Sequence, residues 1–394
     1  MPLRRLSKGV AEAWEVPRDL LLRRYPRFVT GGPLEPDEIP VFAFHGAEPE
    51  DFGRKLDHLA RNGYVTLSTD EYVAVLRRQR PAPGRAVLLT FDDGRGSFWS
   101  VASPLLARHG MKATVFLVPG RMRSRPALGP RLDDAAAASL PREALLRETG
   151  EGALMSWQEV EALARTGLFD FQSHTLLHAR VHVAPRLAGF VTPVSQRGYA
   201  AFDQPLVAER DRDLLGEEVA LGTPLLASAP RTSDSPRFLE DPAVRRACVE
   251  LVAEEGAEAF FARTDWERRL RQALRGTQIR GRAESEEERT AAIRRELGES
   301  RQRIEQHTGG RVVHLCYPWH TAGALARRLA AEAGYETAFC GKVEGVPVTR
   351  PGGDLERLAR IGEDFVELLP GRGRATLAQV LRRKWARRFG GRLR

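Results

Sequence analysis

Short apolar runs alternate with amphipathic segments along much of this 394-residue chain, and this alternation limits the fold more than any other feature. Strands are predicted within residues 39–46, 64–68, 86–93, 112–119, 168–174, 311–318 and 335–341. Helices are predicted within residues 48–63, 69–79, 97–110, 156–167, 286–310 and 321–334. Strands that alternate with helices form a parallel sheet or a barrel, so the chain is predicted to be an α/β protein of this kind.

Unusual polar residues gather where the predicted strands end. They are His45, Asp92, Asp93, His174, His178 and the stretch 318–320, Pro-Trp-His. In parallel α/β folds the carboxyl ends of the strands meet at one edge, and chemistry is concentrated there. The sequence therefore predicts one site built from residues that are far apart in the chain.

Two histidines and two aspartates in this group suit a metal centre. His174 and His178 are four residues apart in HTLLH, a spacing that places both imidazoles on one side of a turn. Asp93 is the natural third ligand, which would complete a two-histidine, one-carboxylate set. A divalent cation would also relieve the repulsion between Asp92 and Asp93, and would leave Asp92 free to act as a base on metal-bound water.

Three motifs, in this order, resemble those of the polysaccharide deacetylase family: TFDDG at 90–94, HTLLH at 174–178 and YPWH at 317–320. These are metal-dependent sugar N-deacetylases that share the chitooligosaccharide deacetylase homology domain. The flanking segment FAFHG at 42–46 is similar to the strand that opens many members. The resemblance covers roughly residues 38–178 and 286–362.

The resemblance implies a distorted (β/α) barrel with fewer than eight units, and it implies roles for the site. Asp92 would be the catalytic base, and a divalent metal, usually Zn²⁺, would be bound by Asp93, His174 and His178. The oxyanion would be held by the metal and the backbone N–H of Trp319, and Tyr317 and Pro318 would complete this wall of the site.

The general acid is left open between two histidines. Many members use a late histidine, but none follows His320 in this chain. We favour His45, on the first strand, over His320, which stands where glycine is more usual. The arginine common before the third-motif proline is also absent from HLCYP, and the sequence does not show which arginine would contact the base.

Four regions are predicted: a lead-in at 1–37, a barrel at 38–178 and 286–370, an insertion at 179–285, and a tail at 371–394. The insertion is expected to begin with loops rich in proline and glycine and to continue as charged helices. Two helices carry N-cap signals, Thr69 or Asp70 in one and Ser156 with Glu159 in capping-box register in the other.

The net charge of +9 arises in the tail. Residues 371–394 contain nine of the 61 Lys and Arg and no acidic residue, so the rest of the chain is balanced against its 52 acidic residues. Apolar residues recur there every four positions between arginines, which predicts a basic amphipathic helix. The alternatives are a helix on an anionic membrane surface and a helix packed on the barrel with solvated arginines. Nucleic acid is not an expected partner, because the excess charge is confined to this helix.

A cytoplasmic location is expected, with the tail as a candidate for peripheral contact with the inner membrane. The first 28 residues lack the apolar core of a secretory signal, and no run is long and apolar enough to span a bilayer. Cys248, Cys316 and Cys340 are far apart and form no CxxC, which argues against a disulfide framework and a cysteine zinc site.

The leading hypothesis is an amide hydrolase that removes acetyl from an amino sugar in a polysaccharide or lipid-linked glycan precursor of the bacterial envelope. The alternative is an impaired barrel that acts as a binding or scaffold subunit of a glycan-assembly complex. A third hypothesis is a deacylase for a small nitrogenous metabolite. Metal content and acetate release discriminate among them.

Overall fold

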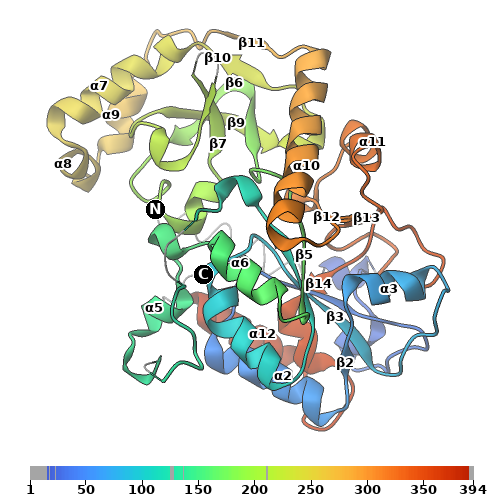
Figure 1. Ribbon diagram of the computed structural model, residues 1–394. Coiled ribbons are helices and arrows are strands. Elements are labelled where there is room, and N and C mark those ends of the chain that lie inside the picture. Colours follow the sequence, from blue (N-terminus) through green and yellow to red (C-terminus); the bar gives the residue numbers. More distant parts are fainter. Residues whose placement is uncertain are drawn as a thin grey trace.

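The computed structural model describes residues 16, 18–22, 24–124, 128–135, 137–209 and 212–389, and its centre is a curled parallel sheet (Figure 1). Its strands are β1 (Val41–Phe44), β2 (Val65–Thr66), β3 (Ala86–Phe91), β4 (Ala113–Leu117), β5 (Phe169–Ser173), β12 (His314–Cys316), β13 (Thr337–Phe339) and β14 (Ile361–Gly362). They pair in the order β13-β12-β5-β4-β3-β1-β14, with β2 added to β3, and every pair is parallel.

The segment around β14 closes this sheet. Leu358 exchanges backbone hydrogen bonds with Ala338 and Cys340 at the β13 edge, at 2.8 and 2.9 Å. Three residues later, Ile361 is in register with Phe42 of β1. One short segment thus joins the two edges of the sheet, and the predicted distorted (β/α) barrel is confirmed.

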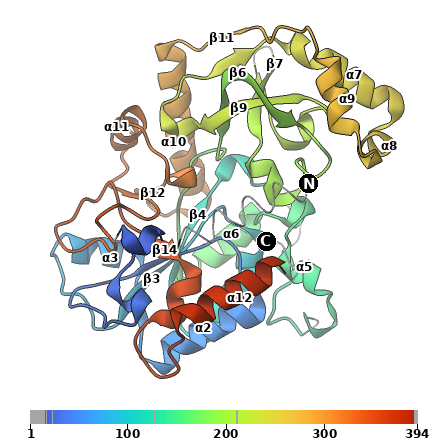
Figure 2. The same cartoon turned by 180° about the vertical axis from the view of Figure 1, so that it is seen from behind.

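Helices cover the outside of the barrel, as Figures 1 and 2 show from opposite sides. They are α2 (Pro49–Arg61), α3 (Thr69–Leu76), α4 (Ser103–Arg108), α5 (Arg142–Leu146), α6 (Trp157–Ala164), α10 (Glu286–Thr308) and α11 (Ala324–Glu332). The capping box of Ser156 and Glu159 at α6 is confirmed. The N-cap prediction for α3 is wrong, because Ser68 caps this helix and pairs reciprocally with Glu71.

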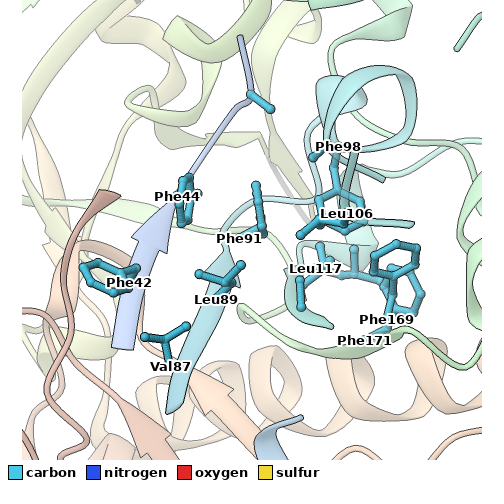
Figure 3. Packing of buried hydrophobic residues seen from close by; sticks show 14 of the residues in the cluster. Phe42, Phe44, Val87, Leu89, Phe91, Phe98, Leu106, Leu117, Phe169 and Phe171 are labelled. Atoms are coloured by element: carbon cyan, nitrogen blue, oxygen red, sulfur yellow. The ribbon is translucent and has the colours of Figure 1, made fainter. Parts of the chain in front are cut away.

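The strands separate two layers of side chains, because successive residues point to opposite faces. On β3, Val87, Leu89 and Phe91 belong to the cluster that packs against the helices, and Figure 3 shows Phe91 facing Phe44 of β1. Leu88 packs on the other face, inside the barrel. Continuing this alternation places Thr90 and Asp92 inside, so the strand directs Asp92 into the mouth of the barrel.

The insertion contains more β-structure than predicted. Its strands are β6 (Arg180–Phe190), β7 (Pro205–Glu209), β8 (Arg212–Leu214), β9 (Pro224–Pro230), β10 (Phe238–Glu240) and β11 (Gly281–Ala283). Three helices follow β10: α7 (Arg246–Glu255), α8 (Ala257–Ala262) and α9 (Trp266–Ala273). The prediction of loops at its start is wrong: β6 contains Pro185 and Gly189, but its pairing with β9 shifts register around them, and such irregularities accommodate these residues.

The C-terminal helix α12 (Leu377–Phe389) packs on the barrel beside α2, as seen in Figure 2. Val380 is buried in the main core, and Leu377 and Leu381 pack against it. Arg383 pairs with Glu367 and Lys384 with Asp364, both on the turn η11 (Glu363–Leu368). One side of the helix therefore packs on the barrel, although Trp385 is 46% exposed. Within the described part of the chain, no helix is long and apolar enough to cross a membrane.

Candidate active site

Asp92 lies at the mouth of the barrel and is bound by an arginine from the closing segment. Both guanidinium Nη atoms of Arg360 donate to it, Nη1 to Oδ1 at 2.7 Å and Nη2 to Oδ2 at 2.8 Å. Asp92 and Arg360 are buried. Burial opposes ionisation of Asp92, but the guanidinium outweighs it and holds the pKa of this carboxyl well below its usual range. Asp92 is thus a carboxylate with a fixed orientation.

Arg360 is one of the residues of the site that sequence reasoning missed. It lies two residues after Leu358, and the Leu358 side chain packs inside the barrel. Its Nη1 also donates to the Thr90 hydroxyl at 3.0 Å, and its Nη2 lies 2.9 Å from Cys316 Sγ. Cys316 is two residues before the third-motif proline, in the stretch HLCYP, which contains no arginine. The cation reaches Asp92 from the residue just before β14 instead of from β12, and only the closure of the barrel shows this.

Asp93 turns away from its neighbour because the backbone reverses there. Its φ is +73°, followed by +71° at Gly94, so the chain passes through two left-handed residues. A side chain at position 94 would clash, since an added Cβ would lie 2.7 Å from Leu117 Cδ2. Arg95 Nε donates to Asp93 Oδ2 at 3.0 Å, and Oδ1 faces the two histidines. Burial opposes its ionisation too, but Arg95 and the nearby imidazoles keep the pKa of Asp93 below its usual range.

The two histidines of HTLLH converge on Oδ1 of Asp93. Their Nε2 atoms lie 3.7 Å (His174) and 3.8 Å (His178) from it. His174 Nδ1 is 2.7 Å from the carbonyl oxygen of Cys316, a contact in which the ring donates and Nε2 keeps its lone pair. Burial lowers the pKa of both rings, that of His178 to about 3, so both are neutral at pH 7.

The loop that carries these histidines is held by α10. Thr175 and His178 have positive φ, so HTLLH is a tight loop and not a helical turn. The backbone carbonyl of the buried Glu296 accepts from Leu176 N at 3.0 Å, and its carboxylate accepts from Leu177 N at 3.0 Å. Sequence reasoning missed this role of Glu296, since the pattern showed only a position on a helix.

Asp93, His174 and His178 fit a divalent metal. Their donor atoms lie within 4.8 Å of one another. Ligands about 2.1 Å from one ion would be roughly 3.0–3.5 Å apart, so the observed 3.7 and 3.8 Å require only a small contraction. Asp92, His174 and Cys316 form a second such group, but Arg360 already occupies both oxygens of Asp92.

The third motif forms the wall opposite Asp93. Trp319 has a φ of +50°, and its indole lies 4.1 Å from the His178 ring, centroid to centroid. Tyr317 and Pro318 are buried below it. His320 is exposed at the rim, and its ring covers Gly341, where an added Cβ would lie 2.6 Å from it.

His45 lies on the side of the site nearest Asp92. It follows β1 directly, its side chain is 50% exposed, and its Nε2 is 4.0 Å from Asp92 Oδ2. The structure thus brings all the predicted residues to one mouth, with His45 beside Asp92 and His320 at the end of the third motif.

A cavity of about 470 Å³ continues from the third motif. It is lined by Tyr317, His320, Ala322, Arg327, Cys340, Gly341, Lys342, Val343, Glu344, Asp354, Glu356 and Arg357. The lead-in contacts this wall, since Asp19 pairs with Lys342 and Arg24 with Glu344. Both signs of charge line the cavity, which suits a ligand with many hydroxyl and amide groups.

Comparison with known proteins places the first two motifs in a family. Residues 79–197 match the family model described as polysaccharide deacetylase. A putative polysaccharide deacetylase of Bacillus subtilis is 30% identical over 92 residues, which is 21% of this chain and 33% of that protein. The poly-beta-1,6-N-acetyl-D-glucosamine N-deacetylase of Escherichia coli K12 is 32% identical over 117 residues, 30% of this chain and 16% of that protein. The chain thus spans a third or less of these curated relatives.

Among solved structures, the deacetylase domain of BpsB from Bordetella bronchiseptica superimposes with a TM-score of 0.49. The sequence identity is 18%, and the match covers 84% of this chain and 98% of that one. A de-N-acetylase from Aggregatibacter actinomycetemcomitans gives 0.48 at 16% identity, covering 82% and 94%.

Proposed function

We propose that this chain, whose residues 79–197 match the polysaccharide deacetylase family model, is a metal-dependent N-deacetylase of an amino-sugar glycan. The observation that supports this most is the arrangement of the two aspartates. Asp93, His174 and His178 offer three donor atoms to a metal, and beside them Arg360 keeps the Asp92 carboxylate ionised and oriented. The named relatives include a deacetylase of poly-N-acetylglucosamine, which suggests the substrate class.

Asp93, His174 and His178 would hold the metal, with Zn²⁺ as the proposed ion. Such an ion supplies positive charge that polarises an amide carbonyl and makes a nearby water more acidic. Asp92 takes the proton from the attacking water, and Arg360 keeps its carboxylate aimed at that position. The water oxygen bonds to the acetyl carbon, the C–N bond breaks, and acetate and a free amine result.

The leaving amine needs a proton, and we propose His45 as its donor. Its 50% exposed side chain can reach a bound substrate, and it stands beside the base. His320 is the second candidate, at the rim of the cavity. Trp319 would donate its backbone N–H to the developing oxyanion, and Tyr317 and Pro318 would support that loop. The cavity beyond His320 is the proposed place for neighbouring sugar units.

The test combines metal analysis with acetate release. We expect about one divalent metal per chain and acetate release from β-1,6- or β-1,4-linked N-acetylglucosamine oligomers. His174→Ala should lose the metal, and Asp92→Asn should keep it but lose activity. Arg303→Gln, on the exposed face of α10, is the matched control. Metal-free, inert protein that binds a glycan or partner would support the scaffold alternative, and deacylation of small amides with no preference for sugars would support the metabolite alternative.

For location, we propose a cytoplasmic protein peripheral to the inner membrane, which would suit a lipid-linked or nascent envelope glycan. The exposed Trp385 and Arg382 of α12 support contact with an anionic surface. Co-sedimentation with phosphatidylglycerol vesicles tests it: Trp385→Ala should reduce binding, and binding that is equal in both proteins, or absent from the wild type, contradicts it.

A further inference from the structure

The insertion reaches the metal ligands through one aromatic residue. Tyr199, in the turn η6 (Gly198–Phe202), lies flat against the guanidinium of Arg95, with 3.6 Å between Cζ and the ring centroid. The Tyr199 hydroxyl donates to the carbonyl oxygen of Ala153 at 3.1 Å. The ring is therefore held at both its face and its edge.

Arg95 is held from the other side by the chain that follows helix α5. Arg95 forms an antiparallel bridge with Leu154, and Gly96 N donates to Ala153 O at 2.8 Å. The Tyr199 hydroxyl bonds to the same carbonyl group. Backbone and ring together hold the guanidinium beside Asp93.

Arg95 uses only one oxygen of Asp93. Its Nε and Nη2 both lie 3.0 Å from Oδ2, whereas Oδ1 is the oxygen that faces His174 and His178. A carboxylate whose outer oxygen is bound in this way can offer only its inner oxygen to an ion. The guanidinium is also a fixed positive charge within a few ångströms of the place where a dication would bind.

We propose that Tyr199 and Arg95 form a positioning pair that reserves Oδ1 of Asp93 for the metal and weakens the site's affinity for it. The inference rests on the proposed function, because it assumes that Asp93, His174 and His178 bind a divalent ion. The insertion thereby takes part in setting the metal affinity of the barrel. Neither residue touches the reacting atoms: the pair orients Asp93, and the guanidinium also acts on the ion directly through its charge.

The direction of the effect follows from charge. A guanidinium and a dication about 6 Å apart repel each other by roughly 1–5 kcal/mol at effective dielectric constants between those of water and a protein surface. Replacing Arg95 with a neutral residue removes this repulsion and should tighten binding. If Arg95 only supported Asp93, its replacement would weaken metal binding, because the Asp93 carboxylate could then move away from the ion.

The experiment measures the affinity of the protein for Zn²⁺ by competition with a chromophoric chelator, with no substrate present. We expect Arg95→Gln to bind Zn²⁺ at least about tenfold more tightly than the wild type, since each 1.4 kcal/mol is a factor of ten. Arg95→Lys keeps the charge and should stay near the wild type. Tyr199→Ala releases the guanidinium of Arg95, so this variant should also bind Zn²⁺ more tightly than the wild type, but by a smaller factor than Arg95→Gln. Arg131→Gln removes a comparable arginine that lies over Trp99 and pairs with Asp133, away from the site, and should change nothing.

Unchanged or weaker binding in Arg95→Gln overturns the inference, provided that its thermal unfolding without metal matches the wild type. If that variant does not fold, Tyr199→Ala decides by the same readout. Wild-type protein that binds no Zn²⁺ refutes the proposed function and this inference together. Wild-type protein that binds Zn²⁺ while Arg95→Gln shows no gain refutes this inference alone.

Discussion

Two adjacent aspartates each pair with an arginine, and the two pairs are built differently. Arg360 is fully buried, comes from the segment that closes the barrel, and contacts both oxygens of Asp92. Arg95 is partly exposed, is stacked on a ring of the insertion, and contacts one oxygen of Asp93. Two-oxygen contact fixes the whole carboxylate and keeps it charged, whereas one-oxygen contact leaves the other oxygen free for a ligand. An aspartate–arginine pair thus suits the proposed base, Asp92, when both oxygens are bound, and the proposed metal ligand, Asp93, when only one is bound.

The largest expected difference between the pairs is in the roles of the acids. Asp92→Asn should reduce deacetylation per folded molecule by about 10²–10⁴-fold, because it removes the proposed general base, while Zn²⁺ stoichiometry stays near the wild type. Asp93→Asn should lose both activity and metal. Acetate release and metal analysis of the same preparations check this, and metal loss in Asp92→Asn as severe as in Asp93→Asn would contradict the division of roles.

The next effect is on stability. Arg360→Met leaves a buried carboxylate without its cation and should cost about 3–5 kcal/mol of unfolding free energy. Urea unfolding of metal-free protein measures it. A cost below about 1 kcal/mol would mean that Asp92 is solvated and not held as the structure shows.

The third effect is the pH dependence of that cost. In the wild type the pKa of Asp92 is lowered, so its ionised form stabilises the fold above about pH 4, and this contribution is lost as the pH falls further. In Arg360→Met burial should raise that pKa, so the sign reverses and the variant gains stability as Asp92 becomes protonated. The deficit relative to the wild type should therefore be larger at pH 8 than at pH 5. An equal loss of unfolding free energy at the two pH values would count against a change in the pKa of Asp92.

The smallest expected effect is the stability of Arg95→Gln. The Arg95 side chain is 18% exposed, and glutamine keeps an amide N–H that can donate to Asp93, so the free energy of unfolding in urea should fall by about 1 kcal/mol or less. A loss as large as that of Arg360→Met would erase the distinction between the two pairs. It would also recast Arg95 as a structural residue.

Local patterns predicted the parts of the site that depend on single strands. His45 and Asp92 follow apolar runs that had to be strands, and a parallel fold brings strand ends together. The prediction of loops at the start of the insertion failed because a proline and a glycine in β6 are tolerated only where its pairing is irregular. The tail was predicted as a basic amphipathic helix, but local spacing did not show that Val380 would be buried in the core or that Glu367 and Asp364 would pair with its cations.

The sequence by itself determined which groups could do chemistry and at which strand ends they stand, because side-chain type and strand periodicity are local properties. The tertiary structure decided which charges compensate them. Arg360 meets Asp92 across 268 residues, and Tyr199 meets Arg95 only because the insertion folds back onto the barrel. Such pairs leave no spacing signal in the chain, since they depend on the closure of the sheet and on the path of a loop.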